Sequence, residues 1–150
     1  MILLSRRSML AIVAVLDVAL NARPHPVAAK VLAARHDLPP RHLETMLQAL
    51  VRAGILKGMR GPRGGYELAL ERRRITAGAI VRAAMASTGE DVMQPAPESA
   101  LIDHVVSPMV AAAGEAFLAK LDELTIDDLC QRAEKLPKGA EGRIIADFTI

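Results

Sequence analysis

Cysteines and aromatic residues are scarce in this 150-residue chain: it has one cysteine, no tryptophan, one tyrosine and two phenylalanines. A single cysteine excludes a disulfide within the chain and any site that needs several thiolates from one chain. With 2% aromatic residues, the chain also lacks the stacking platforms on which single-stranded nucleic acids bind. We therefore expect an aliphatic, mostly helical core.

Long apolar runs are also missing. No run approaches the roughly 20 residues of a membrane span, and Asp17 interrupts a first apolar segment that has no convincing cleavage site. We expect a cytoplasmic protein without membrane contact. The sequence shows no nucleophile–base pair, metal-spaced cluster or phosphate loop either, because the glycines of 61–65 do not stand between a strand and a helix. An enzyme is therefore not predicted.

Charge is present in both signs but is unevenly distributed. Residues 1–85 hold 14 Lys and Arg against 5 Asp and Glu, a net of +9, whereas residues 86–150 hold 5 against 12, a net of −7. A basic half followed by an acidic half is typical of a protein whose first half meets a polyanion. Chance clustering of charges is the alternative.

The first third of the chain predicts three helices. The first helix follows Ser5 and is ended by Pro24. The second helix covers about 27–35, and the third helix follows Pro40 and covers about 41–53. The apolar positions expected to face the core are Met9, Ile12, Val13, Leu16 and Leu20 in the first helix, Val27, Val31 and Leu32 in the second, and Leu43, Met46, Leu47 and Leu50 in the third.

The stretch 54–70 predicts a β-hairpin directly after the third helix. Gly54 ends that helix, and Ile55 and Leu56 form a short strand. A basic glycine-rich turn follows at 60–65, and 66–70 forms the second, returning strand. Two short helices followed by such a hairpin have the order of a winged helix-turn-helix. The alternative is a solvated hairpin whose arginines only keep it soluble.

In a winged helix-turn-helix the start of the third helix enters the major groove, while the hairpin tip reaches phosphates or the minor groove. The residues predicted to bind DNA are Arg6, Arg7, Arg41, His42, Glu44, Thr45, Gln48, Arg60, Gly61, Arg63, Gly64 and Tyr66. For Arg41 and Glu44 the alternative is an ion pair on the surface. For Arg6 and Arg7 the alternative is simple solvation.

The second half divides into a connector, a long helix and a short one. Thr76 caps a helix over 77–86 that closes a DNA-binding domain of residues 1–86, and 87–106 is read as a connector or sensor loop. Ser107 and Pro108 resemble a helix start, so we expect a long helix over 108–124 and a helix capped by Thr125 within a unit of 107–136. A tail, 137–150, holds a candidate strand at 143–150.

The long helix carries apolar residues spaced by three and four, which is typical of paired helices. This stripe consists of Val110, Ala113, Phe117, Leu121 and Leu124. Pairing of two copies across a two-fold axis is favoured over folding back onto the same domain.

Four motifs in order resemble the Rrf-two family of bacterial transcriptional regulators: AIVAVLDVALN at 11–21, HLETMLQALVRAGIL at 42–56, RGPRGGYELA at 60–69 and ITAGAIVRA at 75–83. The resemblance is close over about 5–85 and continues weakly to Glu134. It implies a homodimeric winged helix-turn-helix regulator that binds double-stranded DNA at a palindromic operator. Arg41, His42 and Glu44 would read the major groove, and Arg60 would enter the minor groove.

The chain departs from the cluster-binding members of that family, which carry three cysteines in the connector. Met93 stands where the first would fall, and none of the three is present. Because thiolates are the usual iron–sulfur ligands, no cysteine-ligated cluster and no other cofactor are predicted. Met93 and His104 could be weak ligands and Cys130 could sense oxidants, but an exposed histidine and a buried, inert cysteine are the favoured interpretations.

Taken together, these patterns predict a mainly α-helical protein with a small β-hairpin, in which a winged helix-turn-helix domain precedes a long C-terminal dimerisation helix. The leading hypothesis is a sequence-specific, dimeric, DNA-binding transcriptional regulator. Its signal is left open between a small molecule, a protein effector and oxidation of Cys130. The alternative is a winged-helix protein–protein interaction module that has lost DNA binding, and steep salt dependence of duplex binding would distinguish the two.

Overall fold

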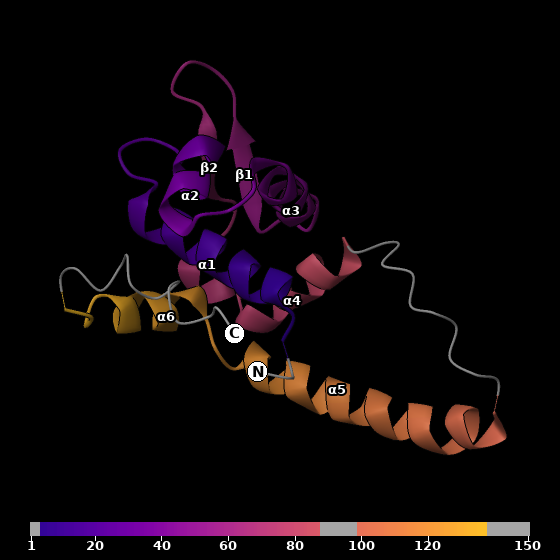
Figure 1. Ribbon diagram of the computed structural model, residues 1–150. Coiled ribbons are helices and arrows are strands. Elements are labelled where there is room, and N and C mark those ends of the chain that lie inside the picture. The colour runs from indigo at the N-terminus through magenta and orange to yellow at the C-terminus, as the bar shows by residue number, and fades with distance from the viewer. Residues whose placement is uncertain (1–3, 88–98, 138–150) are drawn as a thin grey trace.

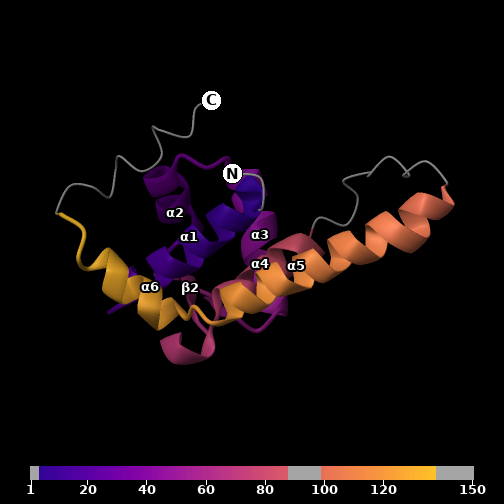
Figure 2. The same cartoon turned by 90° about the horizontal axis from the view of Figure 1, so that it is seen from below.

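The computed structural model of the protein describes residues 4–87 and 99–137. In chain order its elements are α1 (Arg6–Asn21), α2 (Ala29–His36), α3 (Pro40–Arg52), β1 (Leu56–Met59), β2 (Gly65–Leu68), η1 (Arg72–Arg74), α4 (Ala77–Ala86), η2 (Ile102–Val106), α5 (Ser107–Asp122) and α6 (Ile126–Ala133). The elements from α1 to α4 form a head, and α5 extends from one side of it (Figures 1 and 2). The candidate strand at 143–150 lies outside the described residues.

Helix α1 runs through the middle of the head and contacts α4, α6 and β2. The Ser5 side chain caps it by accepting a hydrogen bond from the Ser8 amide at 3.1 Å, as predicted. The predicted buried stripe is confirmed only in part: Ile12 and Leu16 are half-buried and pack against the core, whereas Met9 and Val13 are half-buried without belonging to it and Leu20 is exposed. Because neighbours approach α1 from several sides, its small residues fill the closest contacts, and the buried apolar set is Ala11, Ala14, Val15, Val18 and Ala19.

The predicted second and third helices form the helix-turn-helix. Helix α2 begins two residues later than predicted, because Val27 pairs with the hairpin instead. Leu32 is buried as predicted, but Val31 is 40% exposed. Helix α3 starts with Pro40 in its first turn, and all four predicted stripe residues are buried: Leu43, Met46, Leu47 and Leu50.

The predicted hairpin is present as an antiparallel pair in which Leu56 lies opposite Leu68 and Met59 opposite Gly65. Its first strand is longer than predicted and continues to Met59. At Gly65, an added Cβ would lie 2.4 Å from the Val27 carbonyl oxygen. The missing side chain lets the hairpin reach Val27, with Tyr66 and Val27 exchanging backbone hydrogen bonds of 2.8 and 3.0 Å. The wing is thereby fastened to the loop before α2.

The connector and the long helix differ from their predicted boundaries. Leu101–Val106, expected to be a turn in the connector, is helical, and Ser107 lies inside the helical run rather than capping it. The Ser107 amide donates to the Ile102 carbonyl, and this wide π-turn lies directly before Pro108, which has no amide proton to donate.

As a result, Ile102–Asp122 forms one continuous helix of 21 residues with a mean hydropathy of 1.2 in its most apolar window. By length and composition alone it could span a membrane, so the expectation that no such segment exists was wrong. The sequence prediction missed it because the run was divided at Ser107 and Pro108.

Candidate nucleic-acid interface

The outer face of α3 carries the residues predicted to read the major groove. Since the apolar stripe turns inward, the opposite face leaves exposed side chains at Arg41, His42, Glu44, Thr45 and Gln48. No side chain caps the N-terminus of α3, where Pro39 is the cap residue. Because Pro39 and Pro40 have no amide proton, the amides of the first turn that can face an anion from outside the head are those of Arg41 and His42.

Side chains on this face are largely unpaired. Among the described residues, Thr45 makes the one hydrogen bond from this set, donating its hydroxyl to the Arg41 carbonyl at 3.1 Å. The alternative ion pair between Arg41 and Glu44 does not form in the described part of the chain. Both charges remain free for an external partner.

The wing tip presents two further unpaired cations. Arg60 and Arg63 are exposed, and neither makes an ion pair or side-chain hydrogen bond within the described ranges. The turn between them needs glycine, because Gly61 has a φ of +116° and an added Cβ on Gly64 would lie 2.4 Å from the Met59 carbonyl oxygen. The turn thus holds both guanidinium groups at the end of the hairpin, on the opposite side of the head from α5 (Figure 1).

Tyr66 was predicted to contact DNA, but its position supports the hairpin that forms the wing. Its ring packs against the core and its backbone pairs with Val27 at the base of the wing. Gly64 and Tyr66 are both half-buried, unlike the tip.

The start of α1 lies beside the start of α3, around a cavity of about 370 Å³. Arg6 is exposed, whereas the Arg7 Nη2 atom donates to the Ser87 hydroxyl at 2.7 Å, and the Arg7 Nε atom is buried without a partner. The lining contains cationic and apolar side chains but no acid: Arg6, Arg7, Leu10, Leu38, Pro39, His42, Leu43 and Met46. Cations and two helix N-termini favour an anion here.

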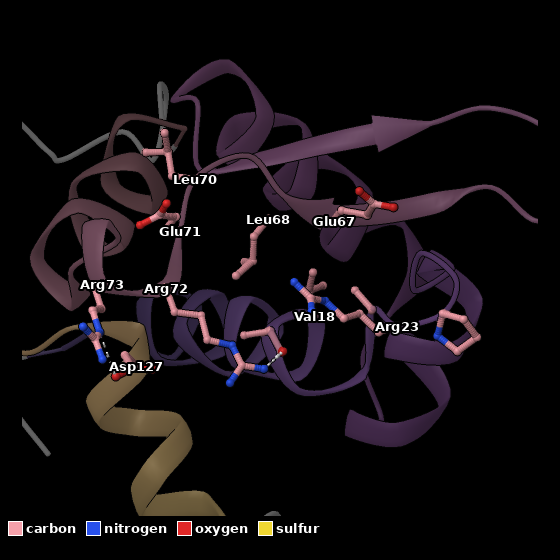
Figure 3. Close-up of a pocket in the computed structure, with 12 residues that line it drawn as sticks. Val18, Arg23, Glu67, Leu68, Leu70, Glu71, Arg72, Arg73 and Asp127 are labelled. Carbon is pink, nitrogen blue, oxygen red and sulfur yellow. Dashed lines mark hydrogen bonds and ion pairs between the residues drawn. The ribbon is translucent and has the colours of Figure 1, made fainter.

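The arginine run 72–74, which forms η1, holds parts of the fold together. Arg72 donates to the Ala19 carbonyl at the end of α1, and the Arg73 guanidinium lies 3.6 Å from Asp127 of α6 (Figure 3). Beside them, at the base of the wing, is an open cavity of about 810 Å³. Figure 3 shows that Arg23 extends along the same cavity, near Leu68 of β2.

Sequence reasoning missed a buried ionic cluster between α1 and α2. Asp17 is 6% exposed, and its carboxylate lies 2.6 Å from Arg35 Nη1 and 2.7 Å from His36 Nε2. Burial by itself raises the pKa of Asp17, but the hydrogen bond with His36 and the charge of Arg35 outweigh it and lower that pKa. The cluster holds α2 against α1, and an acid within an apolar helix was the available sequence signal.

The predicted dimerisation stripe divides into two parts. Phe117, Leu121 and Leu124 are half-buried near the head, where the end of α5 contacts α4. Val110 and Ala113 lie farther out and are exposed. Beside them are other large exposed apolar residues: Leu101, Val105, Val106 and Met109.

The candidate sensor residues do not come together. Cys130 is 1% exposed in α6, and burial raises the pKa of its thiol, which makes it a poor nucleophile. His104 is exposed on η2, and Met93 lies outside the described residues. Within residues 4–87 and 99–137, no group of three or more His, Cys, Asp or Glu residues is placed to hold a metal ion.

Comparison with known proteins extends these observations. Residues 4–132 match the model of the Rrf2 family, described as iron-dependent transcriptional regulators. A helix-turn-helix transcriptional regulator of Synechocystis sp. (slr0846) is 33% identical over 131 residues, covering 84% of this chain and 86% of its own. IscR of Aliivibrio salmonicida is 35% identical over 80 residues, which cover 53% of this chain and 48% of its own.

The structure of T. potens IscR superposes with a TM-score of 0.67 and 28% identity, covering 91% of this chain and 93% of that one. These relatives are named as transcriptional regulators, not as enzymes. The predicted fold class, winged helix-turn-helix with a long C-terminal helix, is confirmed.

Proposed function

Because the chain belongs to the Rrf2 (Rrf-two) family of DNA-binding transcriptional regulators, we propose that it acts as a homodimer on a palindromic operator. The observation that carries this proposal is the set of unpaired, exposed cations on α3 and the wing tip. They belong to a half of the chain, residues 1–85, whose charges sum to +14 − 5 = +9. Such a surface attracts the phosphate backbone.

Each part of this surface suits a different feature of DNA. Arg41 at the start of α3 can donate two hydrogen bonds to guanine, and Glu44 can accept one from the cytosine amino group. Arg60 at the wing tip suits the minor groove or its phosphates. The acid-free cavity beside Arg6 and Arg7 suits a backbone phosphate.

A second copy of the chain is the proposed partner of α5. The outer half of this helix exposes apolar side chains that its own head does not reach, including Met109 at 63% and Val110 at 58%. A lipid partner is disfavoured because Asp103, Glu115 and Lys120 are spread along the helical run and charges are costly within a bilayer. A two-fold dimer would also present two heads to half-sites about 34 Å apart.

We propose that the iron-dependence in the family description does not extend to a cysteine-ligated cluster in this chain. In support, its one cysteine is buried in α6, and the described residues contain no group of three or more His, Cys, Asp or Glu residues placed to hold a metal ion. We therefore propose a regulator without such a cluster, whose effector is a small molecule or a protein. Anaerobic purification should yield a colourless protein with less than stoichiometric iron by metal analysis. A visible absorption band accompanied by iron and sulfide would refute this part of the proposal.

DNA titrations test the main proposal. An operator is first selected from random duplexes, and its affinity is then measured at several salt concentrations. We expect a steep fall with salt and a loss of about 1–3 kcal/mol in Arg60→Ala. Arg132→Ala removes the same charge from α6, away from the wing, and should bind nearly as the parent protein does. Salt-independent or absent duplex binding would instead favour the protein–protein interaction module.

A further inference from the structure

The C-terminal end of α5 is joined to the head through its backbone at one short bridge. Thr76 and Thr125 pair as an isolated antiparallel bridge, with the Ala77 amide donating to the Leu124 carbonyl and the Ile126 amide donating to the Ile75 carbonyl, both at 2.8 Å. Each threonine is also an N-cap, for α4 and for α6 respectively. This bridge fixes where α5 leaves the head. One point of attachment does not by itself fix the direction of the helix.

A second attachment lies one turn back along α5, at Asp122. Its carboxylate accepts a two-pronged pair of hydrogen bonds from Arg82 of α4, at 2.7 and 2.9 Å, and a third from the Thr76 hydroxyl at 3.3 Å. Bidentate arginine–carboxylate pairs are directional because both groups are planar. The pair therefore resists rotation of α5 about the threonine bridge.

Gly78 makes room for this contact. A Cβ added there would lie 2.0 Å from Asp122 Oδ1 and 3.1 Å from the Arg82 Nη1 atom. Gly78 is the second residue of α4, and glycine leaves the unfolded backbone freer than alanine does. Its presence in α4 at this place lets the carboxylate lie directly against the helix.

We propose that Asp122, which packs against Gly78 and accepts hydrogen bonds from Arg82, sets the angle between α5 and the DNA-binding head. This angle would in turn set the spacing of half-sites that the dimer accepts. The part concerning half-sites rests on the proposed dimeric function. Arg82 and Asp122 are 44% and 39% exposed, so this pair adds little to folding stability. Phe117 and Leu121 are half-buried where α5 contacts α4, and the proposed role of the Arg82–Asp122 pair is to set the direction of α5.

The length of the helix amplifies any change at this joint. Ile102–Asp122 has 21 residues and is therefore about 30 Å long. A tilt of about 10° would move its far end by about 5 Å, which exceeds one base-pair step of about 3.4 Å. In both views α5 lies beside α4 toward its C-terminal end, and its outer part extends away from the head (Figures 1 and 2).

The experiment measures the angle within one chain. Nitroxide labels are placed on the head and on α5 through Lys30→Cys and Ala112→Cys, both exposed positions, and Cys130 is left in place because it is buried. Labelled protein is diluted with unlabelled protein, so that only distances within one chain contribute to the pulsed dipolar signal. Four chains are compared: the parent, Asp122→Asn, Gly78→Ala and the control Glu123→Gln. Among the residues that the structure describes, the Glu123 carboxylate pairs with Lys120 alone, on the surface at the end of α5.

We expect one narrow distance distribution in the parent and in Glu123→Gln, and a shifted or broadened one in Asp122→Asn and Gly78→Ala. Gly78→Ala is informative because alanine favours the helix, so its melting temperature should not fall as the angle changes. Parent-like distributions in both joint variants would overturn the proposal. Operators are then selected with the same variants to measure the spacing between half-sites. We expect the joint variants to select an altered or less strict spacing, and an unchanged spacing would overturn the part of the proposal that concerns half-sites. A parent protein that binds no DNA would instead refute the proposed function and leave the distance result standing.

Discussion

The head and the outer half of α5 use the same aliphatic residue types but treat them in opposite ways. In the head, Leu32, Leu47 and Ile80 are fully buried, whereas in α5 Met109 is 63% exposed and Val110 is 58% exposed. The head has several helices and a hairpin that cover one another, so it can enclose its own core. A single helix that leaves the head has no second layer. This difference indicates that the head, together with Ile126 and Cys130 of α6, encloses its own core, whereas the outer part of the long helix leaves apolar side chains uncovered within the described residues.

The strongest test of this difference is to place charge on the exposed apolar side of the long helix. Val106→Glu combined with Val110→Glu should weaken self-association by roughly 100-fold or more, because each buried valine contributes about 1.5–3 kcal/mol. Sedimentation equilibrium measures the effect, and circular dichroism should show an intact head. Ala112→Glu adds charge to another side of the helix and should have less effect. Equal loss in this control would reject the assigned face.

Removing the buried carboxylate of Asp17 should lower the stability of the head and leave α5 unaffected. Asp17→Ala leaves Arg35 and His36 without their shared partner, and we expect it to lower the free energy of unfolding by about 2 kcal/mol, since Arg35 is partly exposed. Chemical denaturation at neutral pH measures this. A loss within error would show that α2 is held by apolar packing alone.

The same carboxylate predicts an acid dependence. Its pKa is lowered in the folded head, so its contribution is complete above the unfolded pKa of about 3.9. The contribution is lost as the pH falls from there through the lower folded value. Asp17→Asn should therefore narrow the difference in the free energy of unfolding between about pH 6 and about pH 3, because pH 6 lies above the unfolded pKa and pH 3 lies below it, where the loss has begun. An unchanged pH profile in Asp17→Asn would contradict the assignment.

The smallest predicted effect concerns the base preference of the DNA-binding face of the head. Glu44 is exposed and unpaired among the described residues, so Glu44→Ala should keep the fold and most of the affinity. It should relax the preference at one base position by about 1 kcal/mol. Operator selection with parent and variant provides the test, and identical profiles would exclude direct readout by Glu44.

The accuracy of the sequence predictions followed the local environment of each helix. Helix α3 was predicted almost completely, because it buries one face and its large apolar residues mark that face. Helix α1 was predicted in its extent but only partly in its buried side, where Ile12 and Leu16 do pack against the core. A helix enclosed by neighbours also uses small residues such as Ala11 and Ala14, and the periodicity of large side chains does not reveal them. The Asp17 cluster was missed for a related reason, since its partners lie on another helix.

The amino-acid sequence by itself determined the order of helices, the glycine-rich basic wing, the exposed α3 face and the family, because these depend on periodicity, caps and turn residues that act within a few positions. The tertiary structure decided which side of α1 is buried, that Arg72 and Arg73 fasten the head, and how Asp122 meets Gly78 and Arg82. These features join residues far apart in the chain, and only packing in three dimensions brings such groups within hydrogen-bonding distance.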